Sequence, residues 1–133
     1  MPDVVTDTQA LVWYLALPSR LSQRAADLLR STVRDGFIIY VPTISLVELE
    51  YLTERGRMAA GTIGEVERAL DDPRSGLVVH PLTREIARSV RHIPRSLVSD
   101  PADRIIAATA FHLNLPLVTS DRRIHASPVQ TVW

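Results

Sequence analysis

Short apolar runs alternate along the chain with longer segments in which apolar residues recur at helical spacing. The runs that predict strands are VVTD near the start, 37–41, 77–82 and 115–120, with 129–133 as a weaker fifth. The segments that predict helices are 8–16, 22–34, 44–55, 59–71, 83–91 and 101–113. The first four strand runs are mostly continuous apolar stretches, which is typical of parallel strands covered on both faces. The alternation therefore predicts an α/β fold.

The length of 133 residues is enough for one hydrophobic core, and no repeat or linker interrupts it. We therefore expect a single domain over residues 1–133. The N-terminal stretch MPDVVTD is acidic, unlike a signal peptide. The longest stretch without Asp, Glu or Arg, 105–120, is shorter than the roughly 20 apolar residues that span a bilayer. We expect a cytoplasmic protein with no membrane partner.

Two residue types are missing: the chain has no cysteine, and all fifteen of its basic residues are arginine. The lack of cysteine excludes disulfide scaffolds, thiolate metal sites and cysteine nucleophiles. The lack of lysine excludes P-loop and Schiff-base chemistry, and it argues against receiver domains and haloacid-dehalogenase phosphatases. The four histidines have no metal-ligand spacing, and no serine lies in a G-x-S-x-G elbow.

Acidic residues lie where the predicted strands end. Asp7 closes the first strand, Glu48 lies one turn into the helix after the second, and Asp121 follows the fourth. Asp103 lies in the first turn of the helix that precedes the fourth strand. Open parallel sheets bind ligands outside the carboxyl ends of their strands, near the point where strand order reverses. We expect Asp7, Glu48 and Asp121 at that edge, joined by Asp103 if its helix begins there.

Each of these acids also fits an ordinary structural role. Asp7 can cap the helix that follows it, and Asp121 can be a turn residue in SDRR. Ser45 and Glu48 have the spacing of a capping box. In DPAD (100–103) the first acid fits an N-cap, and the last complements the helix dipole. Sequence position alone leaves both interpretations open.

A helical wheel separates inward-facing acids from solvated ones. At ~100° per residue, the neighbours within roughly 60° of Glu48 are mostly apolar, whereas Glu50 and Glu54 fall on the opposite side. Those neighbours are Ile44, Ser45, Tyr51 and Leu52. The same angles place Asp103 on an apolar face, while Arg104 points about 100° away from it and is a poor partner. Glu48 and Asp103 are therefore predicted to point inward.

Inward carboxylates need compensation, because desolvating an unpaired charge costs on the order of several kcal/mol. Two such acids, with two more at the same edge, would repel one another and take up protons unless a cation joined them. Oxygen ligands without cysteine suit Mg²⁺ or Mn²⁺. The acids therefore predict a divalent-metal site.

Four stretches resemble the PIN-domain ribonucleases and, within them, the VapC-type toxins of type II toxin–antitoxin pairs. They are DTQALVWYL (7–15), ISLVELEYL (44–52), DPADRIIAATA (100–110) and LVTSD (117–121), and they agree in order and spacing. The resemblance covers essentially the whole chain. It implies a three-layer α/β/α PIN-like domain with a central parallel sheet of about five strands. It also implies an endoribonuclease that uses Mg²⁺, or Mn²⁺, to cleave single-stranded or looped RNA such as tRNA, rRNA or mRNA.

The resemblance places the family's acidic quartet on Asp7, Glu48, Asp103 and Asp121. It implies that Asp7 and Asp103 are the most direct Mg²⁺ ligands and that Asp121 completes the site or holds its waters. Glu48 would serve a second metal or position the attacking water. Supporting hydroxyl positions of the family match Thr119 and Ser45.

Arginine pairs are candidates for phosphate contacts, and Arg122 and Arg123 lead them because they follow Asp121. The net charge is zero, but without the four site acids eleven acidic residues face fifteen basic ones, a balance of +4. Bulky apolar residues such as Trp13 and Tyr14 cover both sides of the first predicted helix, so we expect another chain to cap one side. The resemblance implies a small VapB-like antitoxin, with a homodimer or a toxin–antitoxin hetero-oligomer.

Two other functions remain open on the sequence. One is a housekeeping PIN nuclease in RNA maturation, and the other is an inactive PIN-like module that binds RNA or acts as a scaffold. The intact acidic quartet argues against the inactive module. A neighbouring short reading frame for a DNA-binding antitoxin would favour the toxin over the housekeeping enzyme.

Overall fold

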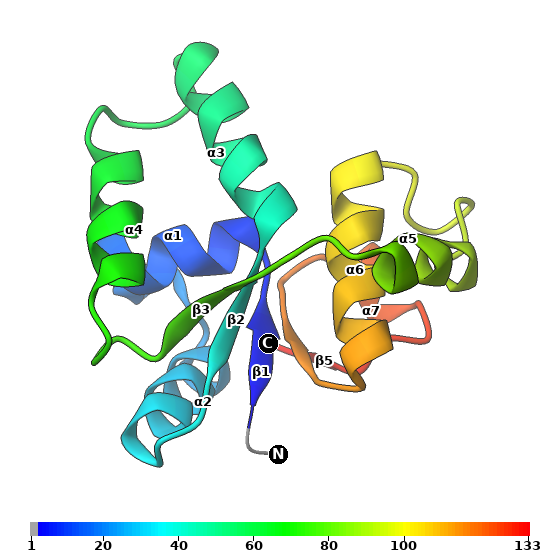
Figure 1. The fold of residues 1–133 in the computed structure, drawn as a ribbon, viewed down its shortest axis with the longest axis horizontal. Helices are drawn as coiled ribbons and strands as arrows, with labels where there is room; N and C mark the ends of the chain where they lie inside the picture. The colour runs from blue at the N-terminus through cyan, green and yellow to red at the C-terminus, as the bar shows by residue number, and fades with distance from the viewer. Residues whose placement is uncertain (1–2) are drawn as a thin grey trace.

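The computed structural model describes residues 3–133, and at its centre lies a parallel sheet of five strands (Figure 1). The strands are β1 (Val4–Thr6), β2 (Ile39–Pro42), β3 (Leu77–His80), β4 (Leu117–Val118) and β5 (Thr131–Val132), in the order β3-β2-β1-β4-β5. Each neighbouring pair is parallel. The chain builds outward from β1 to β3, and then returns to the other side of β1 for β4 and β5. Strand order therefore reverses beside β1.

Seven α-helices within the described residues flank this sheet. They are α1 (Thr8–Ala16), α2 (Gln23–Arg34), α3 (Thr43–Glu54), α4 (Thr62–Asp71), α5 (Arg84–Ser89), α6 (Pro101–Leu113) and α7 (Arg122–His125). Two short 3-10 helices, η1 (Pro18–Arg20) and η2 (Val90–His92), follow α1 and α5. Figure 1 shows α1 to α4 gathered on one side of the sheet and α5 to α7 on the other. The three-layer α/β/α arrangement predicted from the sequence is confirmed.

The two faces of the sheet bury separate apolar clusters. Val4 and Val118 belong to the cluster beneath α1 to α4, whereas their neighbours Val5 and Leu117 belong to the cluster beneath α5 to α7. All four are fully buried. Burying such a side chain stabilises the fold by about 1.5–3 kcal/mol. Because alternate residues enter opposite cores, the strands need apolar residues at consecutive positions, which explains their continuous apolar runs.

Side-chain caps determine where several helices begin. Asp7, Ser22, Thr83 and Asp100 each accept a hydrogen bond from a backbone N–H in the first turn of the following helix. The predicted bounds of α1 and α6 agree with the structure. By contrast, α4 begins three residues later than predicted, because Gly61 turns the chain with a φ of +92° just before it.

Several local expectations are wrong. The capping box fails because α3 begins at Thr43, directly after the strand, so Ser45 already lies inside the helix. The alternative role of Asp121 as a turn residue does not hold, because Asp121 is the N-cap of α7, a four-residue helix that the pattern did not predict. Tyr51 is 55% exposed, so the face of α3 around Glu48 is only partly covered.

No helix in the part of the chain described here is long and apolar enough to cross a membrane.

Candidate active site at the carboxyl edge of the sheet

The four acids expected at the carboxyl edge line one cavity of about 720 Å³. Asp7 and Asp121 follow β1 and β4, the adjacent strands at which strand order reverses. Glu48 comes from α3, and Asp103 from the first turn of α6, which begins at this edge. Four elements that are distant in sequence therefore bring carboxylates to a single place. This is where open parallel sheets bind their ligands.

Asp7 is both a helix cap and a member of this cluster. Its Oδ1 accepts a hydrogen bond from the backbone N–H of Ala10 at 2.8 Å. Burial raises the pKa of Asp7 to about 6, and the charges of Glu48 and Asp121 add to that shift. Hydrogen bonding to Thr119 and Ala10 opposes it. The carboxyl is thus held where its ionised form lacks full compensation.

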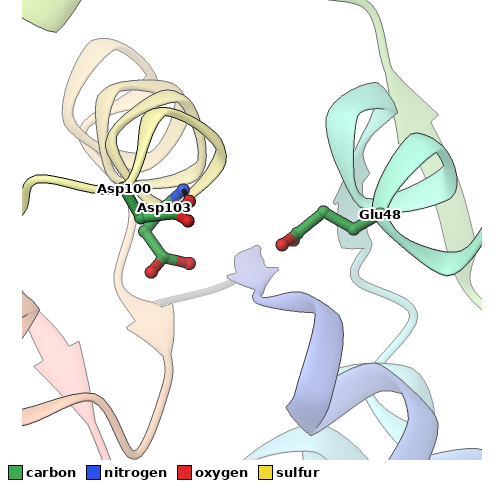
Figure 2. A group of neighbouring side chains, drawn as sticks. All are labelled: Glu48, Asp100 and Asp103. Carbon is green, nitrogen blue, oxygen red and sulfur yellow. Dashed lines mark hydrogen bonds between the residues drawn. The ribbon is translucent and has the colours of Figure 1, made fainter. Parts of the chain in front are cut away.

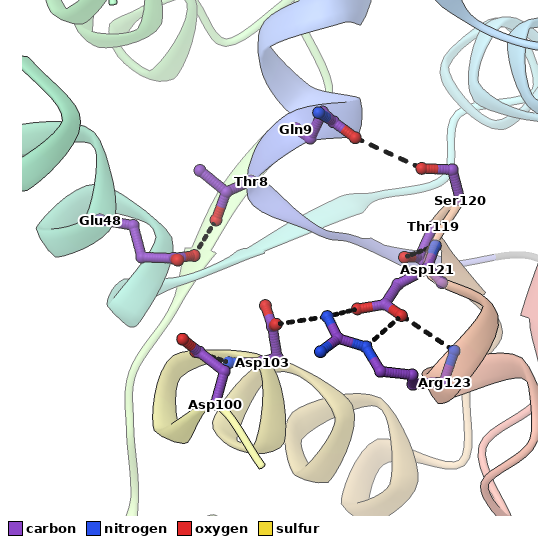
Figure 3. Close-up of polar contacts among 9 residues, drawn as sticks. All are labelled: Thr8, Gln9, Glu48, Asp100, Asp103, Thr119, Ser120, Asp121 and Arg123. Atoms are coloured by element: carbon purple, nitrogen blue, oxygen red, sulfur yellow. Dashed lines mark hydrogen bonds and ion pairs between the residues drawn. The ribbon is translucent and has the colours of Figure 1, made fainter. Parts of the chain in front are cut away.

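Glu48 is held by Thr8, a residue that the sequence analysis did not select. The hydroxyl of Thr8 donates to Oε1 of Glu48 at 2.5 Å, across 40 residues of chain (Figure 3). Burial raises the pKa of Glu48, as does the charge of Asp100, while the Thr8 hydrogen bond lowers it. The one available signal was the position of Thr8 directly after Asp7.

The first turn of α6 contributes two carboxylates to the site. Asp100 caps the helix, as expected, by accepting from the backbone N–H of Asp103 at 3.0 Å. Asp100, Asp103 and Glu48 each offer an oxygen such that all three lie within 4.8 Å of one another (Figure 2). Burial raises the pKa of Asp103 to about 7, and the charges of Asp100, Glu48 and Asp121 add to it. From the sequence Asp100 was expected only as a cap, and its position in the chain does not indicate this proximity to Glu48.

Asp121 is compensated by an arginine. Arg123 donates from Nε to Oδ1 of Asp121 at 3.1 Å and from Nη2 to Oδ2 at 3.0 Å. The same Nη2 lies 3.8 Å from Oδ2 of Asp103, so the guanidinium faces both acids (Figure 3). Burial alone would raise the pKa of Asp121, but the hydrogen bonds and charge of Arg123 outweigh it and lower that pKa. The arginine next to it, Arg122, is exposed.

The hydroxyl residues expected to support the site differ in their contacts. Thr119 is buried at the end of β4, and its Oγ1 accepts from the backbone N–H of Asp121 at 3.0 Å. It thereby links the acids that follow β1 and β4. Ser45 is also fully buried, and its hydroxyl has no hydrogen-bond partner within residues 3–133.

The cavity continues from the acids along α1. Its apolar wall is formed there by Val12, Trp13 and Leu17, and it is faced by residues of α3 and of the segment before α4. Those facing residues include Leu52 and Met58. Two arginines, Arg20 and Arg57, line the same cavity. The site is thus one end of a groove that is acidic at the sheet and apolar, with basic residues, along α1.

The donor chemistry of the acidic end fits a hard divalent cation. Carboxylate oxygens are the ligands that Mg²⁺ and Mn²⁺ prefer. Burial first, and the charges of the neighbouring acids second, raise the pKa values of Asp7 and Asp103, so their ionised forms are not fully compensated within the chain. A bound cation would remove that excess and lower both pKa values.

Comparisons with known proteins agree with the α/β/α fold. The family model described as "PIN domain" matches residues 4–128. The chain is 32% identical over 139 aligned positions to Ribonuclease VapC22 of Mycobacterium tuberculosis (strain ATCC 25618 / H37Rv), with both chains fully covered. The fold is similar to a chain of VapBC2 from Rickettsia felis, solved with a promoter DNA fragment, with a TM-score of 0.74 and 15% identity over 98% of this chain and 97% of that one. A chain of a toxin–antitoxin complex from Klebsiella pneumoniae gives a TM-score of 0.63 at 22% identity, covering 98% and 96%.

Proposed function

The chain belongs to the PIN-domain family, in its VapC ribonuclease branch, and from this premise we propose that it is a Mg²⁺-dependent endoribonuclease toxin. Its substrate would be single-stranded or looped RNA, and a small antitoxin would neutralise it. The observation that carries the proposal is the cluster of carboxylates from four elements at the point where strand order reverses. The pKa values of two of them, raised to about 6 and about 7, support a site built to hold a cation.

We assign the direct metal ligands to Asp7 and Asp103. Asp121 would complete the site or hold its waters, and Glu48 would serve a second cation or position the attacking water. The hydrogen bond from Thr8 supports this assignment for Glu48, because it leaves the other carboxylate oxygen free for water or metal. When bound, Mg²⁺ supplies Lewis acidity at the scissile phosphate and lowers the pKa of the attacking water.

In the proposed reaction, residues of the chain orient the attacking water, accept its proton and bind the RNA. Glu48 orients the water and accepts its proton, and it is suited to this because its pKa is raised. Water, rather than the ribose 2′-hydroxyl, is the nucleophile, so the products carry 5′-phosphate and 3′-hydroxyl ends. Arg123 of α7 contacts the acids, and Arg122 directly precedes it; both would bind phosphates of the RNA.

The groove along α1 is the proposed seat of the antitoxin. Its apolar wall includes Val12 and Trp13, which are only partly buried against the core. Arg20 and Arg57 would pair with acidic groups of the antitoxin. An antitoxin placed there would lie next to the acidic cluster and block RNA. We also expect homodimers or toxin–antitoxin hetero-oligomers, and action in the cytoplasm, where the RNA substrates are.

RNA cleavage in vitro tests the function. Purified protein and its Asp7→Asn variant are incubated with total RNA in Mg²⁺ or in EDTA, and the new ends are mapped. Asparagine still caps helices, so the variant keeps the start of α1. Asp71→Asn, at the exposed end of α4, is the matched control. We expect cleavage only with Mg²⁺, in wild type and control.

Three results would contradict the proposal. Cleavage that persists in EDTA or in Asp7→Asn would rule out the metal mechanism. RNA binding without cleavage under any condition would favour a scaffold module. Cleavage confined to precursor rRNA or tRNA, with no growth arrest on expression and no antitoxin encoded beside the gene, would favour a housekeeping nuclease.

A further inference from the structure

Arg123 engages both oxygens of the carboxylate that it contacts. Its Nε and Nη2 donate to Oδ1 and Oδ2 of Asp121, at 3.1 Å and 3.0 Å, in a fork-to-fork pair. Its own backbone N–H adds a third hydrogen bond, to Oδ1 at 2.9 Å. The lone pairs of Asp121 that face the guanidinium are therefore committed, and Asp121 meets a metal ion fully only if the guanidinium withdraws.

The same guanidinium extends its charge toward the first turn of α6. Nη2 lies 3.8 Å from Oδ2 of Asp103, at the centre of the acidic edge. Its positive charge opposes the mutual repulsion of Asp100, Asp103 and Asp121. Arg123 therefore supplies, within the chain, part of the compensation that a divalent cation would supply.

Moving the side chain of Arg123 away from Asp121 should cost little free energy. The side chain of Arg123 is 57% exposed, and α7 is only four residues long. An exposed guanidinium that leaves a carboxylate is rehydrated by water, so such pairs contribute little net stability. By contrast, the acids that it leaves are more buried, with the side chains of Asp103 and Asp121 28% and 20% exposed. They retain the need for a cation.

We propose that Arg123 is an intramolecular counter-cation, which holds Asp121 and Asp103 in the metal-free protein and exchanges with the divalent cation when it binds. The inference rests on the proposed metal site. Loading of the site is then an ion exchange within one pocket, with the guanidinium as the competitor. Once released, Arg123 lies next to the bound cation, where a phosphate of the RNA can take the place of Asp121 as its partner.

Metal affinity, measured without RNA, tests the exchange. Mn²⁺ is titrated calorimetrically into wild type, Arg123→Gln and Arg122→Gln. With the competitor removed, Arg123→Gln should bind Mn²⁺ about fivefold more tightly, equivalent to ~1 kcal/mol, the upper end of what such a pair contributes. Arg122→Gln removes the same charge from the adjacent position of α7, and screening should keep its Kd within about twofold of wild type. Arg123→Lys keeps the charge without the fork and should fall between Arg123→Gln and wild type.

Thermal unfolding gives a second measurement. In EDTA, Arg123→Gln should melt at a lower temperature than wild type, because the acids have lost their internal cation. In saturating Mn²⁺ the difference should disappear. Equal or weaker Mn²⁺ binding by Arg123→Gln would overturn the inference and would make Arg123 a fixed support of Asp121.

The two proposals fail in distinguishable ways. If wild type binds Mn²⁺ and cleaves RNA while Arg123→Gln binds no more tightly, only the exchange is wrong. If neither wild type nor Arg123→Gln binds Mn²⁺, the metal site is wrong and the exchange falls with it. If Arg122→Gln and Arg123→Gln both bind Mn²⁺ more tightly to the same extent, the change in net charge explains the effect, and the inference is also overturned.

Discussion

Asp103 and Arg104 are adjacent in α6, and the regions that they enter differ in how charge is compensated. Arg104 donates three hydrogen bonds to backbone carbonyls, from Nε and Nη2 to Ile93 at 3.1 and 2.8 Å and from Nη2 to Val90 at 3.0 Å. These hydrogen bonds connect α6 to η2 and to the residue that follows it. Asp103 enters a cavity shared with other acids, where burial and their charges raise its pKa to about 7. The charge of Arg104 is satisfied by the fold, whereas the charge of Asp103 is only partly compensated, by Arg123.

Charged groups that are paired in the folded chain thus differ from charged groups that are only partly paired there. A structural charge is paired in the folded chain, and removing it leaves its partners unsatisfied. The acids of the proposed site are instead held together at the expense of stability, a condition that is common at functional sites. Substitutions in the two regions should therefore have opposite profiles of activity and stability.

The largest effect is expected at Asp103. Asp103→Asn removes a proposed metal ligand and should lower RNA cleavage about a thousandfold, since metal ions contribute several kcal/mol to such reactions. The free energy of unfolding should be unchanged or higher, because the neutral carboxamide ends the repulsion. Cleavage assays and denaturant melts measure the two quantities, with Asp71→Asn as the control. If Asp103→Asn cleaves RNA normally or fails to fold, the proposed difference between Asp103 and Arg104 is wrong.

Arg104→Ala should show the reverse profile. Loss of three charge-assisted hydrogen bonds to part-buried carbonyls should destabilise the protein by about 2–3 kcal/mol. Cleavage per folded molecule should stay within a few-fold of wild type. The control is Arg88→Ala, which truncates an exposed arginine of α5. Specific activity that falls as far as in Asp103→Asn would show that Arg104 also serves the site.

The stability of the metal-free protein should depend on pH in a direction set by the acids. The folded-state pKa values of Asp7 and Asp103 are about 6 and about 7, above the ordinary value of 3.8. Between about pH 4 and pH 7 the folded protein binds more protons than the unfolded chain, so the unfolding free energy falls as pH rises. We expect a loss on the order of several kcal/mol in EDTA, measured by urea melts, because each tenfold difference in proton affinity between the folded and unfolded chains is worth about 1.4 kcal/mol.

Two controls make the pH prediction specific. Asp103→Asn should flatten the profile, because it removes the group with the higher folded-state pKa. Saturating Mn²⁺ should also flatten it near neutral pH by favouring the ionised carboxylates. A wild-type profile in EDTA that rises with pH over this window would contradict the raised pKa values.

The smallest effect is expected at Thr8. Thr8→Val removes the hydroxyl that donates to Glu48 and should lower cleavage about tenfold, in the range found for residues that orient ligands. Thr8→Ser keeps the donor and should retain most activity. Cleavage rates measured against pH are the readout, because the loss of this hydrogen bond should raise the pKa of Glu48 further. Equal loss in both variants would indicate a packing role.

Elements with strong local signals were predictable from the sequence. The helix α6 begins after Asp100, with Pro101 as its first residue, and α1 begins after Asp7; both are ordinary helix starts, and their predicted bounds are correct. By contrast, α7 is too short for apolar periodicity; Asp121 caps its first turn, and its last residue, His125, contacts Thr119 and Thr131. Such contacts are tertiary and leave no local pattern.

The site was predictable as a set of acids but not as a network. Strand ends indicated where Asp7 and Asp121 lie, because the carboxyl ends of parallel strands share one edge. The bond between Thr8 and Glu48 joins residues 40 positions apart, and nothing local predicts it. Whether Arg123 contacts a phosphate or the carboxylate of Asp121 depends on the geometry of its side chain, which the spacing of residues in the sequence does not specify.

Anomalous scattering from crystals grown with Mn²⁺ is the sharpest test of the metal site, because it locates the cation without relying on activity. We expect an anomalous peak at the carboxyl edge, coordinated by Asp7 and Asp103, and abolished in Asp103→Asn. We also expect that the guanidinium of Arg123 has moved away from Asp121. A fully ordered acidic edge with no peak, or a peak elsewhere on the protein only, would contradict the account.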